Sequence, residues 1–207
     1  MPILLFSKKY RRFFPHVNKV VRILTLSDIL ILSGFGLLSP IFAVFLTEQI
    51  QGGNLEVVGF ASTIYFLTKS LLQIPVAEYL DQKRGEKDDF CAMLFGSIII
   101  SLVPLFYLFA KTPFHIYLAQ IFYGIGSALS FPSWMAIFTR HIDKSAECFE
   151  WSIYYTATDL GGALTAALGG ILAQNLGFRP LFFIVFAFSS LGSLLLIEIY
   201  LRMIKGT

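Results

Sequence analysis

Charge, cysteine and enzyme motifs are all scarce in this sequence. Charged residues occupy 14% of the 207 positions and leave a net charge of +3, which does not suggest a nucleic-acid partner. The two cysteines, Cys91 and Cys148, lie far apart and are interpreted as free thiols. No P-loop, Gly-x-Ser-x-Gly or His-Glu-x-x-His motif occurs, and His16, His115 and His141 are isolated. The sequence therefore predicts no enzyme, no metal site and no cofactor.

Apolar residues are abundant instead. They make up 56% of the chain, 22 of them are Phe, and the mean hydropathy is +0.73, which is typical of a membrane protein. A spanning helix needs about 20 apolar residues. Six runs are long enough, and the sequence predicts an all-α domain over residues 23–204 with membrane spans at 23–47, 57–80, 90–110, 113–138, 151–174 and 180–201.

Lys and Arg are distributed unequally between the two sides of these spans. Thirteen of the 16 lie on the side of the chain termini, Lys111 and Arg179 lie on the other, and Lys69 lies inside a span. The positive-inside rule therefore predicts that both termini are cytoplasmic, in an inner or plasma membrane. The basic and aromatic segment 1–22 is either a ligand of the anionic inner leaflet or only a topology signal.

Two stretches of the chain resemble each other. The pattern Gly-x-Gly, Pro, Ala-x-Phe begins at Gly34 in the first span and again at Gly124 in the fourth, with Pro40 and Pro132 as its prolines. A unit of three helices used twice must be inverted, because three is odd. Inverted repeats with Gly and Pro at matching places are typical of transporters, although both residues are also common in membrane helices in general.

A short charged turn joins the second and third spans. It reads Ala77-x-x-x-Asp81, then Lys83, Arg84 and Gly85. This resembles the loop signature of the major facilitator superfamily, with Ala77 in the place of the usual first glycine. The resemblance implies a cytoplasmic latch, in which Asp81 binds a helix N-terminus and a basic neighbour. The alternative is a solvated loop that only sets topology.

The rest of the chain resembles one six-helix half of that superfamily, most like the N-terminal half of a drug or sugar efflux transporter. The Pro40 break and the glycines of the fourth and fifth spans carry this resemblance, whereas Gln120 departs from it, because that region often holds an Arg. Small residues let membrane helices pack closely, and we expect this role at Gly34, Gly36, Pro40, Gly124, Gly126, Gly161, Gly162, Gly169 and Gly170.

Ionisable residues inside a membrane span mark candidate sites for a solute or an ion. Asp28, Lys69 and Asp159 are of this kind, and Gln73 and Gln120 extend the polar stripes on their helices. We expect Lys69 to pair with Asp28 or Asp159 beside a polar cavity. Helix packing by the same polar residues is the alternative.

These features together predict a secondary active transporter of half size, moving a small molecule by efflux, with coupling to protons as an option. Six helices alone would leave a half-cavity facing lipid, so we expect a homodimer or a second six-helix half as partner, besides the lipid bilayer. A truncated half of a twelve-helix transporter and a membrane assembly or receptor subunit without transport activity are the alternatives.

Overall fold

The computed structural model describes residues 17–83 and 85–205, and most of the predicted N-terminal segment 1–22 lies outside them. The described residues are helical apart from short connections. The elements are α1 (Lys19–Leu38), the 3-10 turn η3 (Ser39–Ile41), α2 (Phe42–Gln49), α3 (Leu55–Lys83), α4 (Glu86–Phe109), α5 (Pro113–His141), α6 (Glu147–Leu176) and α7 (Phe178–Lys205).

Local sequence signals set the ends of several helices. The side chain of Asn18 accepts a hydrogen bond of 2.9 Å from the amide of Val20 at the start of α1. Asn54 does the same for Val57 in α3, also at 2.9 Å. Pro113 occupies the first turn of α5, where a backbone N–H would have no partner within the helix, so its absence costs no hydrogen bond. Gly177, at φ 80°, gives the left-handed turn that separates α6 from α7.

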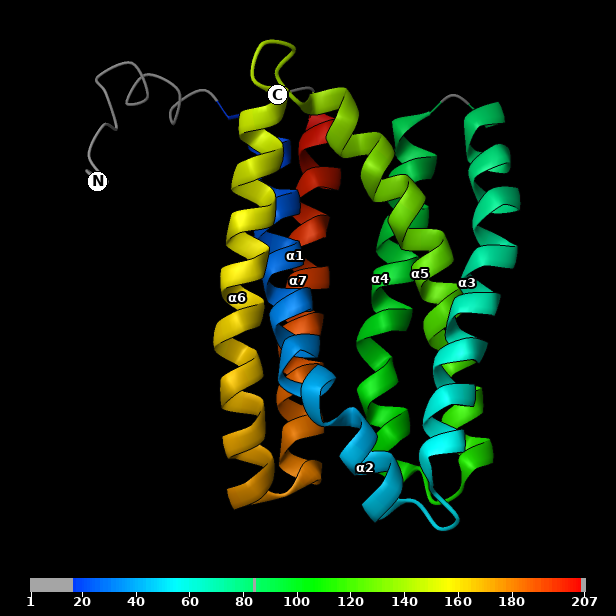
Figure 1. Ribbon diagram of the computed structural model, residues 1–207. Coiled ribbons are helices and arrows are strands. Elements are labelled where there is room, and N and C mark those ends of the chain that lie inside the picture. The colour runs from blue at the N-terminus through cyan, green and yellow to red at the C-terminus, as the bar shows by residue number, and fades with distance from the viewer. Residues whose placement is uncertain (1–16, 84, 206–207) are drawn as a thin grey trace, which may run out of the picture.

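Five of the helical segments are long and apolar enough to cross a membrane: Lys19–Gln49, Leu55–Lys83, Glu86–Phe109, Pro113–His141 and Phe178–Ile199. The sixth, α6, has the length but not the apolarity, since it carries Asp159 and many small or hydroxylated residues. Figure 1 shows α6 side by side with α1 and α7 over the same height, so all six predicted spans correspond to helices of one bundle. The protein is an all-α integral membrane protein.

The two matching prolines act differently. Pro40 lies in η3, and there the first membrane helix breaks between α1 and α2. Pro132 lies inside α5, which continues through it without interruption. A proline removes one intrahelical hydrogen bond and crowds the preceding turn, so either outcome is physically open to it. The helix break is therefore present in the first copy of the sequence repeat and absent from the second.

The packing of the helices has the symmetry of an inverted repeat. Helix α1 packs against α6 and α7, α4 packs against α5 and α7, and α3 packs against α5. If α1 is exchanged with α5, α3 with α6, and α4 with α7, the same set of contacts results. Helices α3 and α6 are thus equivalent, and each packs mainly on one neighbour. Figure 1 shows them on opposite flanks, with α1, α7, α4 and α5 between them.

One end of the bundle carries most of the described basic residues and is called the basic end below. It holds the start of α1 at Lys19, the end of α3 at Lys83, the end of α5 at Arg140, and Lys144 before α6. Figure 1 shows the end of α7 at this same end, as an even number of spans requires.

Glycines let the central helices approach closely. A Cβ added at Gly34 would touch Val185 and Phe188 of α7, and one at Gly36 would overlap Thr165 of α6. In the second repeat, Gly124 approaches α3 and Gly126 approaches α4. Helix α6 is equivalent to α3, and α7 is equivalent to α4. In the first repeat the first glycine therefore contacts the helix of the α4 and α7 type, whereas in the second repeat the second glycine does so. The sequence pattern predicted the contacts but not this exchange.

The predicted packing glycines of α6 fall into two groups. Gly161 faces Ser33 of α1, and a Cβ at Gly169 would overlap the backbone of Leu37. By contrast, a Cβ at Gly162 or at Gly170 would meet nothing within 4 Å. The expected packing role is therefore present at Gly161 and Gly169. The backbone of Gly162 also lies close to α1, 3.4 Å from a Cβ built at Gly36, but a side chain at Gly162 or Gly170 would point into space that the described chain leaves open.

Candidate functional site

An open cavity of about 490 Å³ lies between α1, α3 and α5. Six aromatic rings line it, together with the polar residues Ser39, Ser62 and Gln120; the rings are those of Phe35, Phe42, Tyr65, Phe66, Tyr107 and Tyr123. The break after α1 places Ser39 and Phe42 in the wall. None of the lining side chains carries a charge.

The rings and the polar groups of the cavity hold one another in place. The Gln120 Nε2 donates a hydrogen bond of 3.1 Å to the Tyr107 hydroxyl, although Gln120 is only 5% exposed. The ring of Tyr123 stacks on Phe35 with centroids 5.1 Å apart, and its centroid lies 4.5 Å from that of Tyr65. These walls present flat apolar surfaces and a few oriented hydrogen-bonding groups, which suits a small ligand.

Lys69 does not form the predicted ion pair. Its amine lies 4.5 Å from the ring centroid of Phe131 on α5, a cation–π contact. Among the described residues, the salt bridges join Arg140 to Asp89 and His141 to Glu86. The reason is topological: α3 packs on α5, whereas both candidate carboxylates belong to α1 and α6 on the far side of the bundle.

Asp28 has a partner that the sequence did not indicate. The hydroxyl of Tyr154 on α6 donates a hydrogen bond of 2.8 Å to Asp28 Oδ2. Tyr154 belongs to an aromatic cluster, with its ring centroid 4.8 Å from that of Trp134. The indole Nε1 of Trp134 is buried and has no hydrogen bond to a described residue. The neighbouring Tyr155 is 57% exposed.

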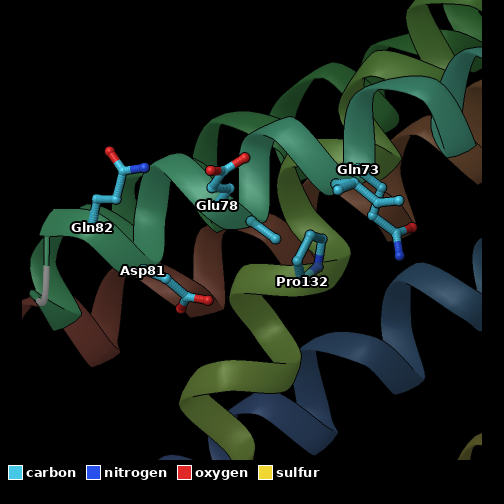
Figure 2. A pocket seen from close by; sticks show the side chains of 7 residues that line it. Gln73, Glu78, Asp81, Gln82 and Pro132 are labelled. Carbon is cyan, nitrogen blue, oxygen red and sulfur yellow. The ribbon is translucent and has the colours of Figure 1, made fainter.

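The remaining predicted site residues lie elsewhere. Asp159 is exposed on α6, and it lines none of the cavities described here. Gln73 lines a surface groove of about 860 Å³ at the basic end, together with Glu78, Asp81, Gln82 and Pro132. In Figure 2, Gln73 and Asp81 point toward the side on which Pro132 lies, and Glu78 and Gln82 point away from it.

The comparison with known protein families agrees with this architecture. A family profile described as Major Facilitator Superfamily matches residues 24–204 of the chain. The chain belongs to the major facilitator superfamily. An uncharacterized MFS-type transporter of Methanocaldococcus jannaschii is 27% identical over 188 residues, which cover 90% of this chain and 46% of the relative. The chain thus spans about half the length of the curated relative it matches.

The loop signature of this MFS chain has an unexpected geometry. Asp81 is exposed in the last turn of α3 and forms no ion pair with a described residue. The Lys83 amine lies over the ring of Tyr79 instead, 4.6 Å from its centroid, and Arg84 lies outside the described residues. Gly85 precedes α4 with φ −131°, an extended conformation open to any residue. Asp81 and Lys83 therefore do not pair with each other, and Gly85 lies in the turn between α3 and α4 with a backbone conformation that does not require glycine.

Sequence reasoning missed the ion pair that joins α4 to α5 beside this loop. Arg140, at the end of α5, binds Asp89 in the first turn of α4, and the side chain of Asp89 is 5% exposed. His141 lies 3.6 Å from Glu86. The available signal was a pair of acidic residues at a helix start, which favours a helix dipole and does not by itself identify a distant partner.

Proposed function

We propose that this chain is one half of a secondary active transporter, and that its cavity holds a small uncharged solute. The observation that carries this proposal is the open cavity between α1, α3 and α5 with its aromatic and neutral polar walls. The walls supply no charge to replace the hydration of an ion. Their rings could face a cation, but a cation would also meet the positive charge of Lys69, which lies one turn beyond Tyr65 on α3.

Coupling to protons is proposed to run through Asp28. This carboxylate lies on the helix that also supplies Phe35 and Gly36 to the cavity, two turns away. Its hydrogen-bond donor, Tyr154, is a neutral hydroxyl, so the carboxylate can take up and release a proton without breaking an ion pair. Tyr154 and α6 would then sense the proton and the solute together. Efflux is the direction we propose, in a plasma membrane with both termini in the cytoplasm.

A second six-helix unit is part of the proposal. The cavity is open and not enclosed by the described chain, and uncovered polar residues at this depth are costly in lipid. The groove that holds Asp81 would serve as the latch between the two units, since this carboxylate has no partner among the described residues of its own chain.

The test uses the full chain in proteoliposomes that contain a pH-sensitive dye. A neutral hexose and a neutral aryl alcohol are added in turn, and the expected result is a solute-dependent proton movement. Asp28→Asn should abolish the proton movement and leave solute binding, measured by protein thermal shift, intact. Lys111→Gln, at an exposed position of the opposite end, is the matched control and should behave as the unaltered protein. Proton movement that persists in Asp28→Asn would contradict the coupling.

The alternative, a membrane subunit that does not transport, is favoured by the exposed flanks of the bundle. It predicts that neither probe binds in the cavity and that Gln120→Leu changes nothing but stability. A loss of hexose or alcohol binding in Gln120→Leu, without loss of folded protein, would decide for the transporter.

A further inference from the structure

The two flanking helices each have a face that the described chain covers only in part. On α3 the face consists of Gly59, Ser62, Phe66, Lys69 and Gln73, which follow one another at helical spacing. We call it the α3 open face. A Cβ at Gly59 would meet nothing within 4 Å, and Phe66 is 61% exposed. This face is distinct from the exposed apolar stripe of the same helix, which suits lipid and consists of Phe60, Leu67, Leu71 and Ile74.

The α6 open face consists of Tyr155, Asp159, Gly162, Ala166 and Gly170. Its small residues recur every four positions, a pattern that lets a second membrane helix approach closely. Open space lies beyond both of its glycines. The stripe that suits lipid on this helix is again separate, with exposed Leu160, Leu164, Leu168 and Ile171.

The two open faces carry opposite charges. Lys69 has the ring of Phe131 as its contact and no carboxylate within ion-pair distance among the described residues. Asp159 is exposed and receives neither a hydrogen bond nor an ion pair from them. A charge in the middle of a membrane helix costs free energy unless it is paired with an opposite charge. The amine of Lys69 on one face and the carboxylate of Asp159 on the other could supply that pair.

A two-fold axis parallel to the helices brings these faces together. In such a dimer the same surface serves both copies, so α3 of one copy lies opposite α6 of the other, twice. Lys69 lies 14 residues from the end of α3 at Lys83, and Asp159 lies 12 residues from the start of α6 at Glu147. At 1.5 Å per residue these are depths of about 21 and about 18 Å from the basic end, within reach of one lysine side chain.

The neighbours along the two faces also match. The helices run in opposite directions, so Phe66 would lie opposite Gly162, and Gln73 opposite Tyr155. The first pair sets an exposed ring against open space beside a glycine, and the second sets an amide against a phenol. Large-on-small and polar-on-polar contacts are what a packed membrane interface needs.

We propose that a second copy of this chain covers the cavity, and that Lys69 of each copy pairs with Asp159 of the other. The two ion pairs flank the cavity and close it from both sides. The inference rests on the proposed function for the need of a second unit, and it identifies that unit and the residues that select it. The pair expected within one chain is thereby assigned to two chains.

The test exchanges the charges in two full-length chains that carry different affinity tags. Lys69→Asp alone sets acid against acid at both contacts, and Asp159→Lys alone sets base against base. Each should lower co-purification with itself by at least about tenfold. Co-expression of Lys69→Asp with Asp159→Lys restores both attractions and should recover the level of the unaltered protein. A pair within one chain could not be restored by such mixing. Lys111→Asp with Asp159→Lys is the control and should not recover.

A second measurement keeps all charges native. In a background with the exposed Cys91 and Cys148 changed to Ser, Phe66→Cys together with Gly162→Cys should form a disulfide-linked dimer in membranes. Leu71→Cys with Leu164→Cys, on the stripes that suit lipid, should not. No cross-link, or co-purification indifferent to the charge exchange, overturns the proposal. Solute-driven proton movement is read separately, so its presence without the cross-link would reject the second copy and retain the transporter.

Discussion

Two adjacent glycines of α6 give a sharp test of the packing described above. Gly169 faces α1, where an added Cβ would overlap the carbonyl of Leu37, whereas a Cβ at Gly170 would meet nothing within 4 Å. Overpacking costs about 1–3 kcal/mol, and a backbone neighbour cannot rotate away, so about 3 kcal/mol applies to Gly169→Ala. Alanine is more favourable than glycine in a helix interior by about 1 kcal/mol, which offsets part of this cost. The expected net destabilisation is about 2 kcal/mol.

Gly170→Ala has only the favourable part, a gain of about 0.5–1 kcal/mol. The two variants should therefore differ by about 3 kcal/mol. At about 2–4 °C per kcal/mol for a chain of this size, their midpoints of thermal unfolding should lie roughly 6–12 °C apart. The assay is thermal unfolding in one detergent, followed by circular dichroism. Equal midpoints for the two variants would refute the close approach of α6 to α1.

Three further predictions concern the basic end. Arg140→Ala leaves the buried carboxylate of Asp89 without its partner and should lower the free energy of unfolding by about 1–3 kcal/mol, since the arginine is partly exposed; Lys111→Ala should have no effect in the same thermal assay. Asp81→Asn should reduce transport and change unfolding by less than about 0.5 kcal/mol, because Asp81 is exposed and unpaired within the described chain; a loss of folded protein would instead support a topology role. A single cysteine at position 111 should react with an impermeant thiol reagent from outside intact cells and one at position 87 should not; labelling at position 87 would reverse the predicted orientation.

Sequence reasoning succeeded where the physics is local. The break at Pro40 and the positions of six helices follow from ring geometry and apolar run length within one segment. Sequence reasoning was less successful at Pro132, because a proline breaks a helix or is tolerated inside it according to its tertiary surroundings.

The sequence by itself determined that this is a helical membrane protein with an internal repeat, and which of its residues would be expensive to bury. The tertiary structure alone decided which of those residues meet. Among the described residues, Asp28 accepts a hydrogen bond from Tyr154, Arg140 pairs with Asp89, and Lys69 contacts the ring of Phe131 without an ion pair. These partners are separated by many residues in the sequence, so they are determined by which helices pack together. Hydropathy sets the number of helices in a membrane, but the close contacts of glycines and small residues set their order in space, and only that order brings polar groups into reach.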